Sequence, residues 1–212
     1  MRITNFETRL FGTNIFLLWN TDGGEAIIVD PGMMSTEERD RVFEFVDRHS
    51  LTVTHIVLTH GHIDHIASAK ATAERYGLPV EGNPDDQFLI DTLPLQIQRF
   101  RLNIQPEPFT LGKALNHGDT LSVGGEPLQV ISVPGHSPGS IALYAPQSGF
   151  VITGDALFSG SIGRTDLPGG DYATLIHAIT DELLTLPADT VVHCGHGPAT
   201  TIAAEARENP YL

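Results

Sequence analysis

Short apolar runs recur along the chain, and each is about the length of a β-strand. Glycine, proline, asparagine or aspartate bounds each run, a pattern typical of largely buried strands. The predicted strands cover residues 16–19, 26–29, 55–58, 128–133, 141–144, 150–153 and 191–193. Some follow one another without a helix between them, so hairpins are expected as well as strand–helix units.

Patterns of helical period lie between these runs. The predicted helices cover residues 35–49, 66–76, 172–186 and the segment after Pro198. The first opens with Ser35 and Glu38, spaced as in a capping box, whereas Gly77 and Pro187 end the second and the third. Strands that occur in pairs and also alternate with helices favour an α/β or α+β fold with helix-covered sheets, rather than a repeated βαβ barrel.

The length of 212 residues is sufficient for one sizeable core, and we expect a single domain over residues 1–212. The segment 83–108 differs from the rest because it is rich in proline and mixed in charge, with a short helix predicted at 86–90. We interpret it as an insertion between two strand regions. It either lies over a functional site or is a surface excursion.

Composition narrows the classes of partner. Hydrophobic residues make up 41% of the chain and charged residues 18%, as in globular proteins. The formal net charge of −14 argues against a nucleic acid or an anionic membrane as partner, because both repel acidic surfaces. No apolar stretch approaches the roughly 18 residues that span a bilayer, and no export signal is recognisable. A single cysteine, Cys194, fits a reducing compartment, so we expect a cytoplasmic protein.

The stretch LTHGHIDHIA places four potential metal ligands within six consecutive positions: His60, His62, Asp64 and His65. It lies between a predicted strand and a predicted helix. Alternate residues of extended backbone point the same way, which directs the first two histidines toward one ion, and the turn into the helix directs the other pair toward a second. Imidazole and carboxylate are ligands that Zn²⁺ prefers. The alternative, a solvated loop, would leave three crowded imidazoles without a role.

Three further candidate ligands follow predicted strands. They are His136 in VPGHSPGS, Asp155 in VITGDALF and His196 in HCGHGPAT. Each is flanked by glycine or proline, which suits a loop that curls round an ion. Loops at the same side of a sheet would bring the three together with the first cluster.

These motifs, in this order, resemble the metallo-β-lactamase superfamily. The resemblance covers nearly the whole chain, since IIVDPG, THGHIDH, GHSPGS, ITGDALF and GHGP all match its expected milestones. It implies a four-layer αββα sandwich with a two-metal site at one edge of the sheets.

The resemblance also implies a ligand set. One ion would be held by His60, His62 and His136, the other by Asp64, His65 and His196, with Asp155 bridging them. Zn²⁺ is the expected metal at both positions, with iron or manganese as alternatives. The implied nucleophile is a hydroxide held between the ions, because metal binding lowers the pKa of water from 15.7 to about 7. Asp64 and Asp155 would be catalytic together with that hydroxide.

The segment FSGSIGRTDLPGGD resembles the small glyoxalase II-like hydrolases and the related persulfide dioxygenases. The first implies cleavage of a small-molecule glutathione thioester such as S-lactoylglutathione. Arg164 would either bind a substrate carboxylate or pair with Asp166 in a structural loop. Full-length glyoxalase II enzymes add a C-terminal helical domain that grips glutathione, and only a short segment follows His196 here, so glutathione recognition stays open.

Other functions remain as alternatives. A persulfide dioxygenase would use a single iron held by two histidines and an aspartate, although every ligand of a second metal is present. Hydrolysis of another acyl thioester or of a lactone would use the same nucleophile. A non-catalytic metal-binding module is the third alternative, which a complete two-metal set does not favour.

The remaining polar residues have simpler interpretations. Asp30 in VDPG either orients a metal ligand or stabilises a turn. Cys194 is interpreted as a small buried side chain. The other histidines, which we do not place on the metals, are His49, His55, His117, His177 and His193.

Overall fold

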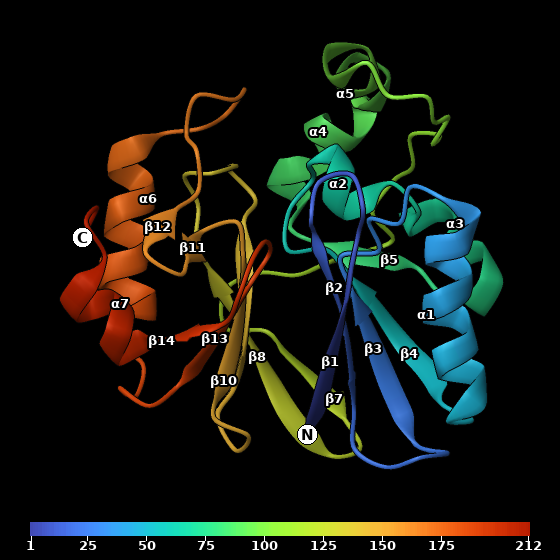
Figure 1. The fold of residues 1–212 in the computed structure, drawn as a ribbon, viewed down its shortest axis with the longest axis horizontal. Coiled ribbons are helices and arrows are strands. Elements are labelled where there is room, and N and C mark those ends of the chain that lie inside the picture. The colour runs from blue at the N-terminus through green and yellow to red at the C-terminus, as the bar shows by residue number, and fades with distance from the viewer.

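Two six-stranded sheets pack face to face, and helices cover the outer surface of each (Figure 1). The computed structural model describes residues 1–212. In order across the first sheet, the strands are β1 (Arg2–Glu7), β2 (Asn14–Trp19), β3 (Glu25–Val29), β4 (Thr52–Val57), β5 (Val80–Gly82) and β6 (Lys113–Ala114). The first three strands are antiparallel, and β3 to β6 run parallel.

The second sheet has the order β14-β13-β10-β9-β8-β7. Its strands are β7 (Thr120–Val123), β8 (Glu126–Ser132), β9 (Ile141–Ala145), β10 (Phe150–Gly154), β13 (Val191–Cys194) and β14 (Thr200–Thr201). Only β10 and β13 pair in parallel. A small separate ribbon joins β11 (Leu157–Phe158) to β12 (Ser161–Ile162).

The helices lie on the outer faces and at one end of the sandwich (Figure 1). On the side of the first sheet are α1 (Thr36–Arg48), α2 (Ile63–Ile66) and α3 (Ala69–Tyr76), whereas α6 (Tyr172–Ala178) and α7 (Ile202–Glu208) cover the second. The 3₁₀ turn η1 (Pro84–Asp86), α4 (Gln87–Asp91) and α5 (Leu93–Phe100) lie at the upper end of the view. None of these helices combines the length and the apolar character that crossing a membrane requires.

Strand β2 shows how side-chain alternation builds the layers. Phe16 and Leu18 belong to the apolar cluster between the two sheets, and Ile15 and Leu17 belong to the cluster between the first sheet and its helices. A third cluster, which includes Leu175, joins the second sheet to α6 and α7. Each fully buried side chain of this size contributes about 1.5–3 kcal/mol to folding. Three apolar layers define four structural layers, so the αββα sandwich is confirmed.

Most predicted elements are present, with changes at their ends. Helix α1 begins as predicted, because the side chains of Ser35 and Glu38 cap it reciprocally. The helix predicted at 66–76 begins later, as α3, and only Ile66 belongs to the preceding turn α2. The break lies near Ser68, whose backbone N–H donates to the carbonyl of Pro31 instead of to a helical carbonyl. The helix predicted at 172–186 continues beyond α6 as a π-helical turn, η2 (Ile179–Leu183).

Candidate metal centre

The loop after β4 carries the first group of candidate ligands. His60 and His62 are buried, and the structure brings them to His136, from the loop after β8. One ligand atom from each of the three lies within 4.8 Å of the other two. The closest contact joins His62 Nδ1 to His136 Nε2 at 2.9 Å.

The second group lies beside the first. Asp64 and His65 stand in the single turn of α2, and His196 follows β13. Their ligand atoms also lie within 4.8 Å of one another. His196 Nε2 is 3.1 Å from Asp64 Oδ2 and 3.3 Å from His65 Nε2. A further group joins His60 and His65 to Asp155, so the ligands of the HGHID loop surround one continuous centre. Their division between two ions stays a prediction.

Asp155, directly after β10, contacts both groups. Its Oδ1 lies 3.3 Å from His65 Nε2, and its Oδ2 lies 3.4 Å from His196 Nε2 and 3.6 Å from His136 Nε2. Oδ2 thus lies near one histidine of each group, and Oδ1 lies near another histidine of the second group. The carboxylate therefore stands between the groups, where a bridging ligand would be placed. All seven predicted ligands thus converge at one edge of the sandwich.

The outer ring nitrogens of three histidines are held by acceptors. His65 Nδ1 lies 2.9 Å from Asp30 Oδ2, His136 Nδ1 lies 2.7 Å from the carbonyl oxygen of Arg164, and His196 Nδ1 lies 3.0 Å from that of Phe11. Because an acceptor requires a proton on the facing nitrogen, these contacts fix the rings so that each Nε2 faces the centre. Of its two interpretations, Asp30 thus has the orienting one.

Asp30 is itself fixed in an unusual conformation. It is fully buried, has a φ of 52°, and accepts hydrogen bonds from the backbone N–H and the hydroxyl of Thr59, both at 2.6 Å. A positive φ is uncommon for a residue other than glycine and costs energy that the surrounding contacts must offset. The strained turn after β3 therefore aims a carboxylate at His65.

Three buried atoms of the centre have no hydrogen-bond partner: His60 Nε2, His62 Nε2 and Asp155 Oδ1. Leaving a buried polar atom unpaired costs about 1–3 kcal/mol. Histidine nitrogens and carboxylate oxygens that face one another without partners are a donor set suited to a divalent cation. The residues present therefore fit the metals implied by the ligand pattern.

Electrostatics divide the centre into two parts. Burial, reinforced by the neighbouring His65, lowers the pKa of His60 well below its usual range, and burial with His136 lowers that of His62 to about 3. Burial alone would raise the pKa of Asp155, but the charge of His65 and the close contacts of His196 and His65 keep it well below the usual range. Neutral imidazoles and an ionised carboxylate are the protonation states that bind metals.

The pKa of His196 is shifted in the opposite direction from those of His60 and His62. Burial opposes its protonation, but hydrogen bonds to Asp155 and Asp64 raise its pKa to about 10. The pKa of His65 is raised in the same way, because three carboxylates outweigh its burial. The second group thus holds protons where a metal would supply positive charge.

A buried aspartate outside the ligand set braces the first group. Asp86, at the end of η1, accepts hydrogen bonds of 2.7 Å from the backbone N–H groups of Gly61 and Gly139 and from the hydroxyl of Ser137. Gly61 separates two ligands, and Ser137 follows His136. The segment 83–108 is therefore built into the site, and its interpretation as a mere surface excursion is wrong.

Gln96 of α5 adds to this brace. Its Oε1 accepts from the backbone N–H of Ile63 at 2.9 Å, and its Nε2 donates to the carbonyl of Gly61. Neither bracing residue is predicted from the sequence, because neither belongs to a ligand motif. For example, Asp85 is exposed and the adjacent Asp86 is buried, but nothing in the local sequence indicates which of the two aspartates faces the interior.

Two glycines leave room for the ligands. A Cβ on Gly32 would lie 1.7 Å from the carbonyl oxygen of Asp64, and one on Gly195 would lie 2.2 Å from Asp155 Oδ1. Real side chains cannot approach so closely. Glycine is therefore required at these places by the close packing of the loops.

The remaining candidates take structural positions. The exposed guanidinium of Arg164 forms two hydrogen bonds of 2.6 Å with Asp166, as one of its two interpretations expected. Cys194 is buried, and burial raises the pKa of its thiol to about 12, so it is a poor nucleophile. The other five histidines belong to none of the ligand groups.

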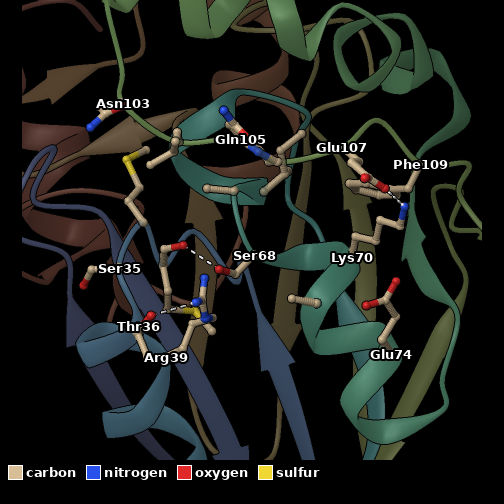
Figure 2. Close-up of a pocket in the computed structure, with 17 residues that line it drawn as sticks. Ser35, Thr36, Arg39, Ser68, Lys70, Glu74, Asn103, Gln105, Glu107 and Phe109 are labelled. Carbon is tan, nitrogen blue, oxygen red and sulfur yellow. Dashed lines mark hydrogen bonds and ion pairs between the residues drawn. The ribbon is translucent and has the colours of Figure 1, made fainter.

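A cavity of about 610 Å³ lies between the starts of α1 and α3 and the segment 103–109 (Figure 2). Figure 2 shows Lys70 directed toward Glu107, with which it forms an ion pair, and Arg39 beside Thr36, to which it donates a hydrogen bond. None of the candidate ligands lines this cavity. This cavity is therefore separate from the candidate ligand groups.

The pattern of the metallo-beta-lactamase superfamily matches residues 8–196, a span that includes every residue of both ligand groups. The chain belongs to the metallo-beta-lactamase superfamily. Among its relatives in this superfamily is the hydroxyacylglutathione hydrolase GloC of Haemophilus influenzae, which is 39% identical over 215 residues, covering 100% of this chain and 98% of GloC. The predicted membership is thus confirmed.

Solved structures of the superfamily extend the comparison. BLEG-1 B3 metallo-beta-lactamase has a TM-score of 0.88 at 34% identity, covering 100% of this chain and 99% of its own. TTHA1623 in a di-iron-bound form has a TM-score of 0.87 at 36% identity, covering 99% and 100%. ETHE1 from Myxococcus xanthus has a TM-score of 0.78 at 31% identity, covering 99% and 84%. The fold is shared among proteins with different names, so the substrate must be inferred separately.

Proposed function

We propose that this superfamily member is a metal-dependent hydrolase that cleaves an acyl thioester, with S-lactoylglutathione or a related hydroxyacyl-glutathione as substrate. The observation that carries the proposal is the pair of three-residue ligand groups joined by Asp155. The similarity to hydroxyacylglutathione hydrolase GloC over the full length of both chains supports the choice of thioester. Arg164 remains a candidate for substrate binding if its pair with Asp166 opens.

His60, His62 and His136 would hold one ion and Asp64, His65 and His196 the other, with Asp155 shared. Two bound divalent ions supply an activated water at neutral pH and polarise an acyl carbonyl. The protein keeps the ring nitrogens of its ligands in the required tautomers through Asp30 and two backbone carbonyls. We infer Zn²⁺ for both positions, while the di-iron form of TTHA1623 supports iron as the alternative.

A persulfide dioxygenase is the second candidate, and the similarity to ETHE1 supports it. It would need only one iron. The second ligand group, with Asp64 and His196 3.1 Å apart, would then have no role, so the hydrolase is preferred. The cytoplasmic location inferred from the single cysteine suits a substrate built on a thiol.

The test uses purified protein whose metals have been quantified. We expect about two ions per chain and hydrolysis of S-lactoylglutathione, assayed beside other thioesters and lactones. Replacing Asp155 by alanine should abolish both metal loading and thioester cleavage, because it removes the ligand shared by the groups. Oxygen uptake with glutathione persulfide, without thioester cleavage, would overturn the hydrolase and favour the dioxygenase.

A further inference from the structure

A cavity of about 170 Å³ opens beside the first ligand group. His62 forms part of its wall, and the rest comes from α4, α5 and the loop at 167–168. Pockets that adjoin reactive groups are the usual places for the non-reacting part of a substrate. The segment that braces the centre therefore also shapes the space in front of it.

The wall of this cavity is apolar. Leu95 and Phe88 are 63% and 38% exposed, and they are two of the six large apolar side chains of the protein with such exposure. Both line this one cavity, together with Phe100 and Leu167. Exposed apolar side chains that gather at a concave site indicate contact with an apolar part of a ligand.

One cation in the cavity wall has no counter-ion. Arg99 lines the cavity but takes part in none of the ion pairs of the chain, whereas Arg164 nearby is neutralised by Asp166 through two hydrogen bonds. Arg99 lies close enough to Asp166 for its charge to help lower the pKa of that carboxyl, although the hydrogen bond from Arg164 has the larger effect. A guanidinium next to an apolar wall suits a carboxylate, which it can bind through two parallel hydrogen bonds.

We propose that Arg99 binds a carboxylate of the substrate while Phe88 and Leu95 contact the apolar segment that leads to it. The inference rests on the proposed thioester hydrolysis and specifies its substrate class: a thioester that carries a carboxylate several atoms away from the reacting carbonyl. The carboxylate belongs either to the thiol half, as in a glutathione thioester, or to the acyl half, as in a dicarboxylic acyl group. Arg99 is thus a specificity-determining residue supplied by α5.

Three thioesters distinguish these sources. S-lactoylglutathione carries carboxylates on the thiol half, S-succinyl-N-acetylcysteamine carries one on the acyl half, and S-lactoyl-N-acetylcysteamine carries none. Replacing Arg99 by glutamine should lower kcat/KM for a charged thioester about tenfold, mainly through KM, because a uniform binding contact is lost. The neutral thioester should lose much less, and Arg99→Lys should retain part of the preference.

The matched control is Arg101→Gln, which removes the same charge two residues away from a side chain that does not line the cavity. It should keep the wild-type ratio between charged and neutral thioesters. An equal loss for all three substrates in Arg99→Gln, or an unchanged ratio, would overturn the inference while leaving thioester hydrolysis intact.

Direct binding separates this inference from the proposed function. If the wild type cleaves no thioester, the proposed hydrolysis fails, and calorimetric titration with glutathione and with succinate still tests Arg99. Binding about tenfold weaker in Arg99→Gln than in Arg101→Gln would support the carboxylate contact. Absence of binding to the wild type, or equal binding to both variants, would overturn it.

Discussion

Asp86 accepts a hydrogen bond of 2.7 Å from the backbone N–H of Gly61, the residue between two candidate metal ligands. Burial raises the pKa of Asp86 although three donors oppose this effect, so the structure keeps an acidic group where its burial is costly. Its contacts with Gly139 and Ser137 tie the loop after β8 to the loop after β4. One side chain therefore sets the spacing between His62 and His136.

Replacing Asp86 by alanine should destabilise the protein by about 2–4 kcal/mol, because three buried donors lose their acceptor. The affinity for the first metal should fall about 10- to 100-fold, as for other residues that orient ligands. Urea denaturation of the metal-free protein and zinc competition with a chelating dye measure the two effects. The neighbouring exposed Asp85→Ala should change neither value; similar losses in both variants would contradict the bracing role.

Replacing Asp30 by asparagine should weaken binding of the second metal about 10- to 100-fold. The carboxylate that faces His65 Nδ1 and both donors of Thr59 would become an amide that cannot accept from all three. Titration of zinc stoichiometry should show the first ion retained and the second released at lower chelator concentration. Asp40→Asn, an exposed change on α1, serves as the control; loss of both ions together would contradict this division of labour.

Replacing Gly195 by alanine should reduce metal content with a smaller effect on the metal-free protein. The added methyl would meet Asp155 Oδ1 at 2.2 Å and His65 Cε1 at 2.9 Å, so these side chains must move. Overpacking of this kind costs about 1–3 kcal/mol. Elemental analysis and thermal unfolding with and without a chelator check the result. Full metal content in the variant would show that the loop after β13 can shift without cost.

The acid stability of the first sheet should depend on Glu81. Burial would raise its pKa, but hydrogen bonds from His55 and Lys113 outweigh burial and lower it below its ordinary value of 4.5. The unfolded chain therefore binds the proton more readily, and the stabilisation is present above that value and lost as the pH falls through the lowered pKa. For metal-free Glu81→Gln, the free energy of unfolding should vary less with pH below 4.5 than in the wild type. Parallel curves for the two proteins would contradict the assignment.

The sequence was sufficient to predict features whose geometry is determined within a single short segment. The capping box at Ser35 and Glu38 begins α1, and the alternation of His60 with His62 sends both toward one group. In the same way, entry into α2 turns Asp64 and His65 to the other group. These features depend on backbone periodicity, which the sequence carries directly.

Features that depend on distant contacts could not be read from the sequence. Strand β1 has half-exposed residues without an apolar run, and its pairing with β2 defines it. Helix α5 was not predicted, and the roles of Asp86 and Gln96 arise only when the segment 83–108 folds against the loop after β4. In these cases tertiary hydrogen bonds decide between alternatives that are locally equivalent.

The contact between His196 and Phe11 bears on the order in which the parts of the centre form. These residues are separated by 185 positions, and Thr13 forms an isolated bridge with the same histidine. Contacts so distant in sequence form late, because the intervening chain must first be brought together. During synthesis, the three histidines of the first group have all emerged once residue 136 has left the ribosome, whereas the second group must wait for residue 196. The second group would therefore be completed only after nearly the whole chain has been made.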